Sequence, residues 1–325
     1  MRRIWSEFVP YDTLRSQHVM QMLFRRGIQP LVAVTPSSLG DLSALTEAYA
    51  DAGMDVGLWP MVNDDDGRWG STFNAGVFSD FVRRVVDASH GAKTIALDLE
   101  PPIHLLRRLV AGDVLGLKSA AGARPEAHTE GQETLRALTA DLGARGCKCL
   151  GVVNPMLLGD QRHRSAWQWL LGTPIDDLPF DALSFMAYTS LFSGYSKGLL
   201  SRRVAVSLLA QTARAARAQW NERASLSLGS VGVGALGDER PYRWVAELSD
   251  DVAVARGCGV DDLALFDLSG VLRQPHPEAW LDAFVYTPAA TRVPRIAKRA
   301  RILKSIVKRA SHAIETVRRI RLADA

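Results

Sequence analysis

Short apolar runs alternate along most of the chain with longer segments of helical periodicity. Apolar runs bounded by glycine, proline or polar residues are typical of strands buried in a parallel sheet. They predict eight strands, over residues 4–9, 30–35, 55–62, 94–100, 149–154, 182–189, 226–233 and 262–268. Between them, apolar residues recur every three or four positions, which predicts helices over 11–26, 39–52, 75–89, 129–145, 202–223 and 242–256.

Eight strands with helices between them predict a (β/α)8 TIM barrel, which we place over residues 1–288. A barrel of about 250 residues explains why a chain of 325 residues need not split into several domains. The alternative is a doubly wound open sheet, but it should carry a glycine-rich turn after the first strand. The nearest match to that turn, residues 232–237, follows the seventh predicted strand, where we interpret it as a barrel loop.

The fourth predicted strand ends in two acids, Asp98 and Glu100, followed by Pro101 and Pro102. Because side chains alternate along a strand, Asp98 and Glu100 point to the same face, roughly 6 to 7 Å apart. Carboxylates this close favour a state in which one of them keeps its proton, as general acid catalysis requires. We therefore predict a catalytic pair at this strand end, the alternative being a solvated or salt-bridged strand end.

The other predicted strands also deliver polar or aromatic groups to their C-terminal ends, where barrel enzymes carry their active sites. The candidate substrate-binding residues are Trp5, Glu7, Trp59, Asn63, Asn154, Met186 and Asp267, and Tyr188 joins the candidate catalytic residues. Aromatic rings beside amides and carboxylates suit a sugar, which stacks on the rings and hydrogen-bonds to the polar groups. We expect the long connection over residues 107–128 to act as a specificity loop or lid.

Asp98-Leu99-Glu100 on strand four and Met186-Ala187-Tyr188 on strand six resemble the active site of glycoside hydrolase family 18, the chitinase-like barrels. The resemblance implies that Glu100 protonates the glycosidic oxygen. It also implies that Asp98 orients the substrate's own acetamide, which acts as the nucleophile, and that Tyr188 hydrogen-bonds to it. The expected partner is a carbohydrate or glycoconjugate.

The chain departs from the family pattern at Ala96, Lys93 and Thr189, which stand where the family carries aspartates, and at strand eight, which ends without a tryptophan. Ala96 and Thr189 favour an alternative, a noncatalytic carbohydrate-binding or scaffold barrel. A further enzymatic alternative keeps Glu100 as acid or base and takes Glu7 or Asp267 as the nucleophile or water activator.

Charge divides the chain unevenly. Residues 291–325 hold 11 of the 39 basic residues and two acids, which leaves 28 basic and 33 acidic residues in the rest. That body has no basic surplus for binding nucleic acid. The three cysteines lack the spacing of a zinc site or a disulfide framework, the histidines form no HxH or HxxxH pair, and an acidic loop over 63–67 lacks the EF-hand glutamate. We therefore predict no metal and no cofactor.

The predicted tail, residues 289–325, shows an a/d apolar pattern among many arginines and lysines. This pattern predicts a basic amphipathic helix within residues 291–322 that contacts an anionic membrane surface or a partner helix, or packs on the body. Because the sequence shows no secretory leader and no long apolar segment, we expect a cytoplasmic protein, with peripheral attachment at the inner face of the membrane as the alternative.

Overall fold

The computed structural model describes residues 1–110, 125–162, 165–190, 200–232, 241–295 and 297–323. Its eight strands form a closed barrel in chain order from β1 to β8, with β1 pairing parallel to both β2 and β8. The strands are β1 (Arg2–Ser6), β2 (Gln29–Val34), β3 (Gly57–Pro60), β4 (Thr94–Leu99), β5 (Lys148–Val153), β6 (Ala182–Met186), β7 (Ala224–Gly229) and β8 (Asp262–Phe266). The predicted TIM barrel is therefore confirmed.

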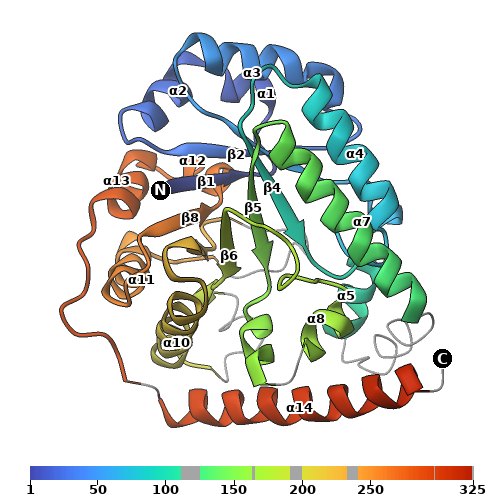
Figure 1. The fold of residues 1–325 in the computed structure, drawn as a ribbon. Coiled ribbons are helices and arrows are strands. Elements are labelled where there is room, and N and C mark those ends of the chain that lie inside the picture. The colour runs from blue at the N-terminus through green and yellow to red at the C-terminus, as the bar shows by residue number, and fades with distance from the viewer. Residues whose placement is uncertain (111–124, 163–164, 191–199, 233–240, 296, 324–325) are drawn as a thin grey trace. The chain divides into compact units, whose positions relative to one another are not determined.

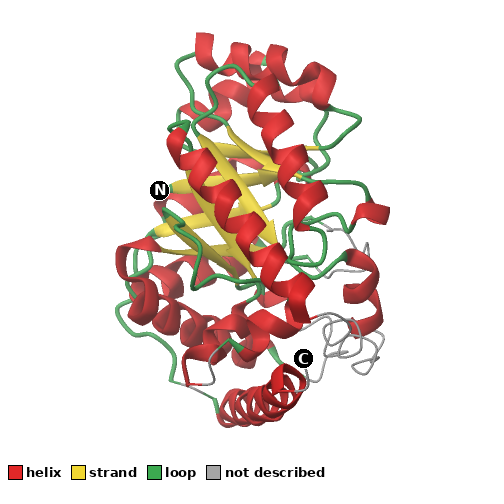
Figure 2. Ribbon diagram, turned by 45° about the vertical axis from the view of Figure 1, so that its right-hand side comes forward, coloured by secondary structure: helices red, strands yellow, loops and turns green. Residues whose placement is uncertain are grey.

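Helices follow the strands, as Figures 1 and 2 show. The α-helices are α1 (Tyr11–Leu14), α2 (Gln17–Phe24), α3 (Leu42–Asp51), α4 (Ala75–Ala88), α5 (Ile103–Val110), α7 (Pro125–Ala144), α8 (Ala166–Leu171), α10 (Arg202–Trp220), α11 (Val245–Gly257), α12 (Leu268–Leu272), α13 (Pro277–Tyr286) and α14 (Lys298–Ala323). Short 3-10 helices are η1 (Leu39–Asp41), η2 (Asp64–Asp66), η3 (Pro155–Arg162) and η4 (Asn221–Arg223).

The chain divides into two compact units. The first unit comprises residues 1–33, 44–57 and 182–303, and the second comprises residues 34–43, 58–181 and 304–325. The first unit thus holds β1, β6, β7 and β8, whereas the second holds β4 and β5.

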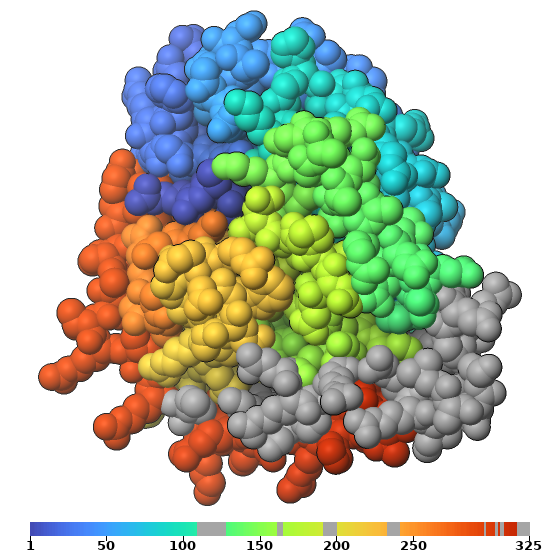
Figure 3. All heavy atoms as spheres, viewed as in Figure 1, coloured from blue at the N-terminus to red at the C-terminus, as the bar shows by residue number. Residues whose placement is uncertain are grey.

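In the first unit, β6, β7 and β8 pair in parallel, and α10 packs beside α11 (Figure 1). Part of α10 forms the yellow surface in Figure 3. Arg3 on β1 forms an ion pair with Asp262 on β8, and Asp262 also accepts a hydrogen bond from Ser225 on β7 (3.2 Å). These contacts join three strands near their N-terminal ends.

In the second unit, β4 and β5 pair in parallel over six residues each, and every residue of β4 is buried. Helix α7 packs against both α4 and β5. Buried leucines on α7, Leu135, Leu138 and Leu142, recur at the three- and four-residue spacing of one helix face, so α7 covers β5 with an apolar stripe.

All eight predicted strands are present, but each ends one to four residues before its predicted end. Polar residues at these ends bond to loops or helices instead of continuing the sheet, as Thr189 does with Asp251. The predicted helix over 11–26 is two helices, because Ser16 caps α2 through a hydrogen bond from the Val19 amide (3.4 Å).

The predicted connection over 107–128 begins and ends in α5 and α7, and its residues 111–124 lie outside the described part of the chain. Most of the glycine-rich segment 232–237 does so too.

The tail contains the expected helix, α14, which has packing contacts in each unit. In the first unit, Ala300 is fully buried, and the Ala297 amide donates to Ser207 on α10 (2.8 Å). In the second unit, Trp167 on α8 donates its indole N–H to the buried Ser311 (2.5 Å). These contacts favour the interpretation of the tail as a packed helix, and its contact with a membrane or partner helix stays a prediction.

Within the described residues, no helix combines the length and the apolar character needed to cross a membrane.

Candidate active site

The backbone at the end of β4 is held by the loop that follows β3. The Gly70 amide donates to the carbonyl oxygen of Asp98 (2.9 Å), and the Glu100 amide donates to the carbonyl oxygen of Gly70 (3.1 Å). Gly70 thus pairs in parallel with Leu99, as a one-residue extension of the sheet. A third bond, from the Ile103 amide to the Gly67 carbonyl oxygen (3.1 Å), continues the contact past the strand.

Position 70 requires glycine because a neighbouring ring fills the space beside it. A Cβ atom there would lie 2.5 Å from Cε1 of Phe78, whose side chain is fully buried in α4. The close approach of backbone to ring lets the loop reach the end of β4. Asp98 is 4% exposed there and Glu100 is half-buried.

Charged side chains tie the acidic part of this loop to neighbouring arginines. Asp64 pairs with Arg68 (2.9 Å) and with Arg107 (3.2 Å). Partial burial alone would raise the pKa of Asp64, but hydrogen bonds and charge from the two arginines outweigh it and lower that pKa. Among the described residues, no group of three or more His, Cys, Asp or Glu side chains could hold a metal ion.

The other predicted site residues of the second unit have different surroundings. Trp59 is 4% exposed in β3, so most of its ring belongs to the core. Asn63 is exposed at the start of η2, and its carbonyl oxygen accepts hydrogen bonds from the Asp66 and Arg68 amides. Asn154 follows β5, half-buried, and its side-chain oxygen accepts from the Met156 amide (2.9 Å).

In the first unit, Tyr188 packs against the end of β8. Its ring lies 5.6 Å from that of Phe266, centroid to centroid, with the planes tilted by 42°. A Cβ atom at Gly229, the last residue of β7, would come within 3.2 Å of the Tyr188 ring. Tyr188 is therefore packed closely against the ends of β7 and β8. It is half-buried and lies two residues beyond β6.

Thr189, the neighbour of Tyr188, belongs to a buried polar cluster. Its hydroxyl donates to the carboxylate of Asp251, which is fully buried in α11. Arg202, the first residue of α10, donates to both carboxylate oxygens of Asp251 (2.8 and 3.1 Å), and the Tyr242 hydroxyl donates to it as well (2.6 Å). The four residues Thr189, Arg202, Tyr242 and Asp251, called the Asp251 cluster below, fix the chain directly after Tyr188.

The remaining predicted site residues of the first unit divide between core and rim. Trp5 is 1% exposed and donates its indole N–H to Ser227 (3.1 Å), which in turn bonds to Ser184 (2.9 Å). These three side chains form a hydrogen-bonded chain across β1, β7 and β6. Glu7 and Met186 are half-buried.

Asp267 caps a short helix. One of its carboxylate oxygens accepts from the Gly270 amide (3.0 Å) and the other from the Ser269 hydroxyl (2.6 Å), at the start of α12. Burial raises the pKa of Asp267, and these hydrogen bonds act in the opposite direction. Both carboxylate oxygens thus have partners within the chain.

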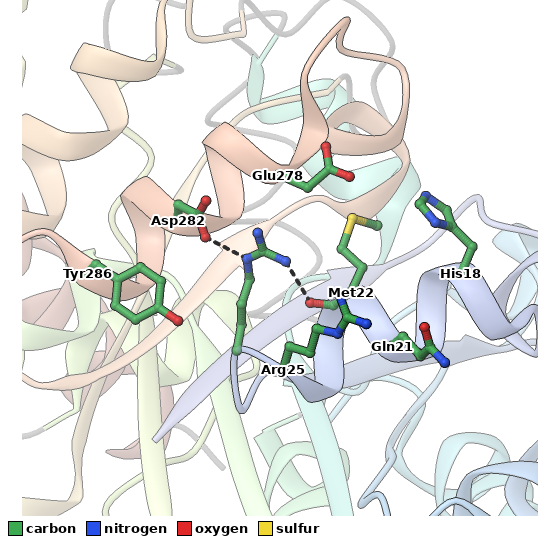
Figure 4. A pocket seen from close by; sticks show the side chains of 8 residues that line it. His18, Gln21, Met22, Arg25, Glu278, Asp282 and Tyr286 are labelled. Carbon is green, nitrogen blue, oxygen red and sulfur yellow. Dashed lines mark hydrogen bonds and ion pairs between the residues drawn. The ribbon is translucent and has the colours of Figure 1, made fainter.

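A pocket of about 250 Å³ lies elsewhere in the first unit, between α2 and α13 (Figure 4). It is lined by His18, Gln21, Met22, Arg25, Arg26, Glu278, Asp282 and Tyr286. Arg26 is bound to Asp282 (2.7 Å) and to the Met22 carbonyl oxygen (3.1 Å). The pocket contains none of the predicted site residues, so we do not place the candidate site there.

Sequence reasoning missed Gly70, the Asp251 cluster apart from Thr189, and Asn74, whose side chain accepts a hydrogen bond from the amide of Ser71, the neighbour of Gly70 (2.9 Å). Asp251 carried a signal, because it falls between Leu248 and Val252 on the buried face of α11. Gly70 carried none, since its role depends on contacts with a strand that lies well beyond it in the chain.

No family model matches the sequence, and no curated protein matches it. The glycoside hydrolase domain of PgaB (BpsB) from Bordetella bronchiseptica is similar in structure, with a TM-score of 0.53 and 13% identity. The match covers 88% of this chain and 99% of that domain. At this identity, the likeness shows the barrel fold alone.

Two further barrels are less similar. A class V chitinase from Nicotiana tobaccum has a TM-score of 0.48 and 12% identity, covering 88% of this chain and 99% of that one. A D-allulose 3-epimerase from Methylomonas sp. has a TM-score of 0.46 and 11% identity, and the match covers 95% of this chain and 97% of the epimerase chain. With TM-scores below 0.5, these two likenesses carry no argument about function.

Proposed function

We propose that this barrel is a glycoside-hydrolase-like enzyme acting on a glycan or glycoconjugate, with Glu100 as general acid and Asp98 and Tyr188 assisting. The observation that carries the proposal is the acid motif at the end of β4, whose backbone is bound on both sides of Leu99 by Gly70. A loop bound to the strand end in this way gives the Glu100 side chain a defined starting position. Barrel enzymes carry their catalytic residues at such strand ends.

The similar barrel from Bordetella bronchiseptica is described as a glycoside hydrolase domain, which agrees with this choice of reaction. In the proposed reaction, Glu100 transfers its proton to the glycosidic oxygen while the bond from that oxygen to the anomeric carbon breaks. The substrate's acetamide oxygen attacks the anomeric carbon, with Asp98 orienting the acetamide and Tyr188 hydrogen-bonding to it. Water then opens the cyclic intermediate, giving a proton back to Glu100.

Substrate contacts are proposed at Glu7, Asn63, Asn154 and Met186, which lie at or just beyond strand ends. Asn63 is exposed, and the other three are half-buried. Trp5, Trp59 and Asp267 are better suited to supporting roles. Each is less than 5% exposed, so a sugar would meet little of their side chains in this conformation.

One observation favours the noncatalytic alternative, a carbohydrate-binding barrel. Thr189 occupies the position at which family 18 enzymes supply an aspartate, and its hydroxyl is bound to Asp251. A hydroxyl engaged in this way is poorly placed to replace a carboxylate beside a substrate acetamide.

The test is turnover of a panel of chromogenic glycosides, including N-acetylglucosaminides, by the wild-type protein, Glu100→Gln and Asp98→Asn. Glu130→Gln is the matched control, because Glu130 is exposed on α7 of the same unit. We expect the first substitution to lower kcat by about 10²- to 10⁴-fold, the typical contribution of general acid catalysis, and the control to change nothing. If the wild-type protein and all the folded variants bind sugar but hydrolyse none of the glycosides, the noncatalytic carbohydrate-binding barrel replaces the enzymatic proposal.

A further inference from the structure

Asn74, at the start of α4, uses every hydrogen-bonding position of its side-chain amide. Its nitrogen donates to the carbonyl oxygens of Asp66 (2.7 Å) and Trp69 (2.8 Å). Its oxygen accepts from the Ser71 amide (2.9 Å) and the Ser71 hydroxyl (2.8 Å). A side-chain amide has two N–H donors and two acceptor lone pairs, so this arrangement specifies asparagine.

These bonds hold the residues on either side of Gly70. Trp69 and Ser71 are its chain neighbours, and Asn74 binds the carbonyl of the first and the amide of the second. The peptide groups that carry the Gly70 amide and carbonyl are thereby fixed in orientation. Those are the two groups that bind the end of β4.

The chain just after β4 has few other backbone N–H groups that can bind the neighbouring loop. Pro101 and Pro102 have no N–H group. The backbone donors just after β4 that bind the loop containing Gly70 are therefore the amides of Glu100 and Ile103. Glu100 binds Gly70, and Ile103 binds Gly67. Gly67 is also close to Asn74, since a Cβ atom there would lie 2.6 Å from the Asn74 side-chain nitrogen.

We infer that Asn74 is a positioning residue for Glu100 and acts on it through Gly70. This inference rests on the proposed function for the catalytic role of Glu100, but the hold of Asn74 on the Glu100 backbone can be measured without turnover. Asn74 itself would touch neither the substrate nor the transferred proton. Its loss would let Glu100 occupy several positions, of which few allow proton transfer.

The test compares Asn74→Asp with the wild type. The Asn74 side chain makes no capping hydrogen bond to α4, so the helix should be preserved in this variant, while the two donors to Asp66 and Trp69 are lost. The Asp160→Asn variant is the matched control. Asp160 is a buried side chain of the same unit that accepts from two backbone amides at the start of α8, with no bond to the loop or to β4.

Two readouts separate the inference from the proposed function. Hydrogen exchange at the Glu100 and Ile103 amides should become about tenfold faster in Asn74→Asp and remain unchanged in Asp160→Asn. For a substrate that the wild type hydrolyses, kcat should fall about tenfold or more in Asn74→Asp, with KM within about twofold of the wild-type value.

Unchanged exchange at Glu100 and Ile103 in a folded Asn74→Asp variant would overturn the inference, whatever the activity. Equal acceleration in Asp160→Asn would also overturn it, because the effect would then be one of general stability. Faster exchange in Asn74→Asp alone, in a protein that hydrolyses no glycoside, would confirm the hold on Glu100 and reject the proposed function.

Discussion

The end of β4 and the end of β6 both carry candidate catalytic residues, but different interactions hold them. At β4, the backbone of Asp98 and Glu100 is fixed by hydrogen bonds to Gly70, between groups that carry no net charge. At β6, the chain beside Tyr188 is fixed through Thr189 by the buried ion pair of Asp251 and Arg202. The first arrangement spreads its strength over several neutral bonds, whereas the second depends on one carboxylate.

This difference determines how each region should respond to substitution. A neutral hydrogen bond contributes about 1 kcal/mol net, so the loss of one bond leaves most of the β4 contact in place. Removing one partner of a buried ion pair leaves the other charged group and its neighbours without compensation. Substitutions at the end of β6 should therefore lower the stability of the fold more. Substitutions at the end of β4 should mainly shift the position of Glu100.

The largest expected effect is that of Asp251→Ala. The substitution leaves Arg202, Tyr242 and Thr189 without their shared acceptor, and we expect the free energy of unfolding to fall by about 3 kcal/mol. This is the lower end of the usual range, because the Arg202 side chain is 30% exposed and water relieves part of the cost.

Urea denaturation measures this loss of stability. The control is Asp250→Ala at the adjacent exposed position, which should change the free energy of unfolding by less than about 0.5 kcal/mol. Similar small losses in both variants would remove the contrast between the two strand ends.

A smaller effect on stability is expected from the ionisation of Asp160. This residue extends the comparison with Asp251, because it is a buried carboxylate in the same unit as Asp98 and Glu100. Burial raises the pKa of Asp160 from 3.8 to about 6, outweighing its two backbone hydrogen bonds. Because the folded state holds the proton more tightly, the contribution of Asp160 to stability is greatest below about pH 4 and is lost as the pH rises through 6.

The fall between pH 4 and pH 7 should be on the order of 2 kcal/mol, and Asp160→Asn should abolish this part of it. Burial also raises the pKa of Asp267, which therefore changes stability with pH in the same direction. For this reason the quantity to compare is the slope of stability against pH in the wild type and in Asp160→Asn, and not the stability at any one pH. Urea titrations at several pH values give both slopes. Parallel slopes in the two proteins would show that Asp160 ionises normally.

The smallest effect on stability is expected from Gly70→Ala. The added methyl group meets the buried Phe78 ring, and overpacking of this kind should cost about 1 to 2 kcal/mol while shifting the loop from β4. Gly76→Ala, within α4, is the matched control. No atom lies within 4 Å of its new Cβ, so it should raise stability by about 0.5 to 1 kcal/mol. Thermal unfolding distinguishes the two signs, and a stabilising Gly70→Ala would mean that the loop does not approach Phe78 as closely as described.

Much of the fold followed from local patterns. Apolar runs marked all eight strands, and Pro101 and Pro102 marked the end of β4 to within one residue. The strand ends were overestimated elsewhere because the chain alone does not show that Thr189 binds Asp251 and leaves the sheet. Short helices such as α12 and α13 were missed, since one to three turns give too little periodicity to recognise.

The candidate site was less predictable than the fold. Asp98, Glu100 and Tyr188 were recognisable as polar groups at strand ends, but their supports were not. Gly70 acts through backbone groups that any residue carries, and its partners on β4 lie about 30 positions away in the chain. Asn74 acts through a side-chain amide on its own loop, and nothing in the sequence links that loop to β4. Trp5 illustrates the converse, because a tryptophan at a strand end suits both a sugar platform and a core, and only burial separates the two.

The proton-donor role of Glu100 is tested most directly by the dependence of hydrolysis on the leaving group. The rates of wild type and Glu100→Gln should be compared on two series of aryl N-acetylglucosaminides, one with strongly acidic phenols and one with weakly acidic phenols. If Glu100 is the acid, the variant should lose about 10²- to 10⁴-fold on weakly acidic phenols and far less on strongly acidic ones, which leave without protonation. An equal loss on both series, or no loss on either, would contradict the assignment.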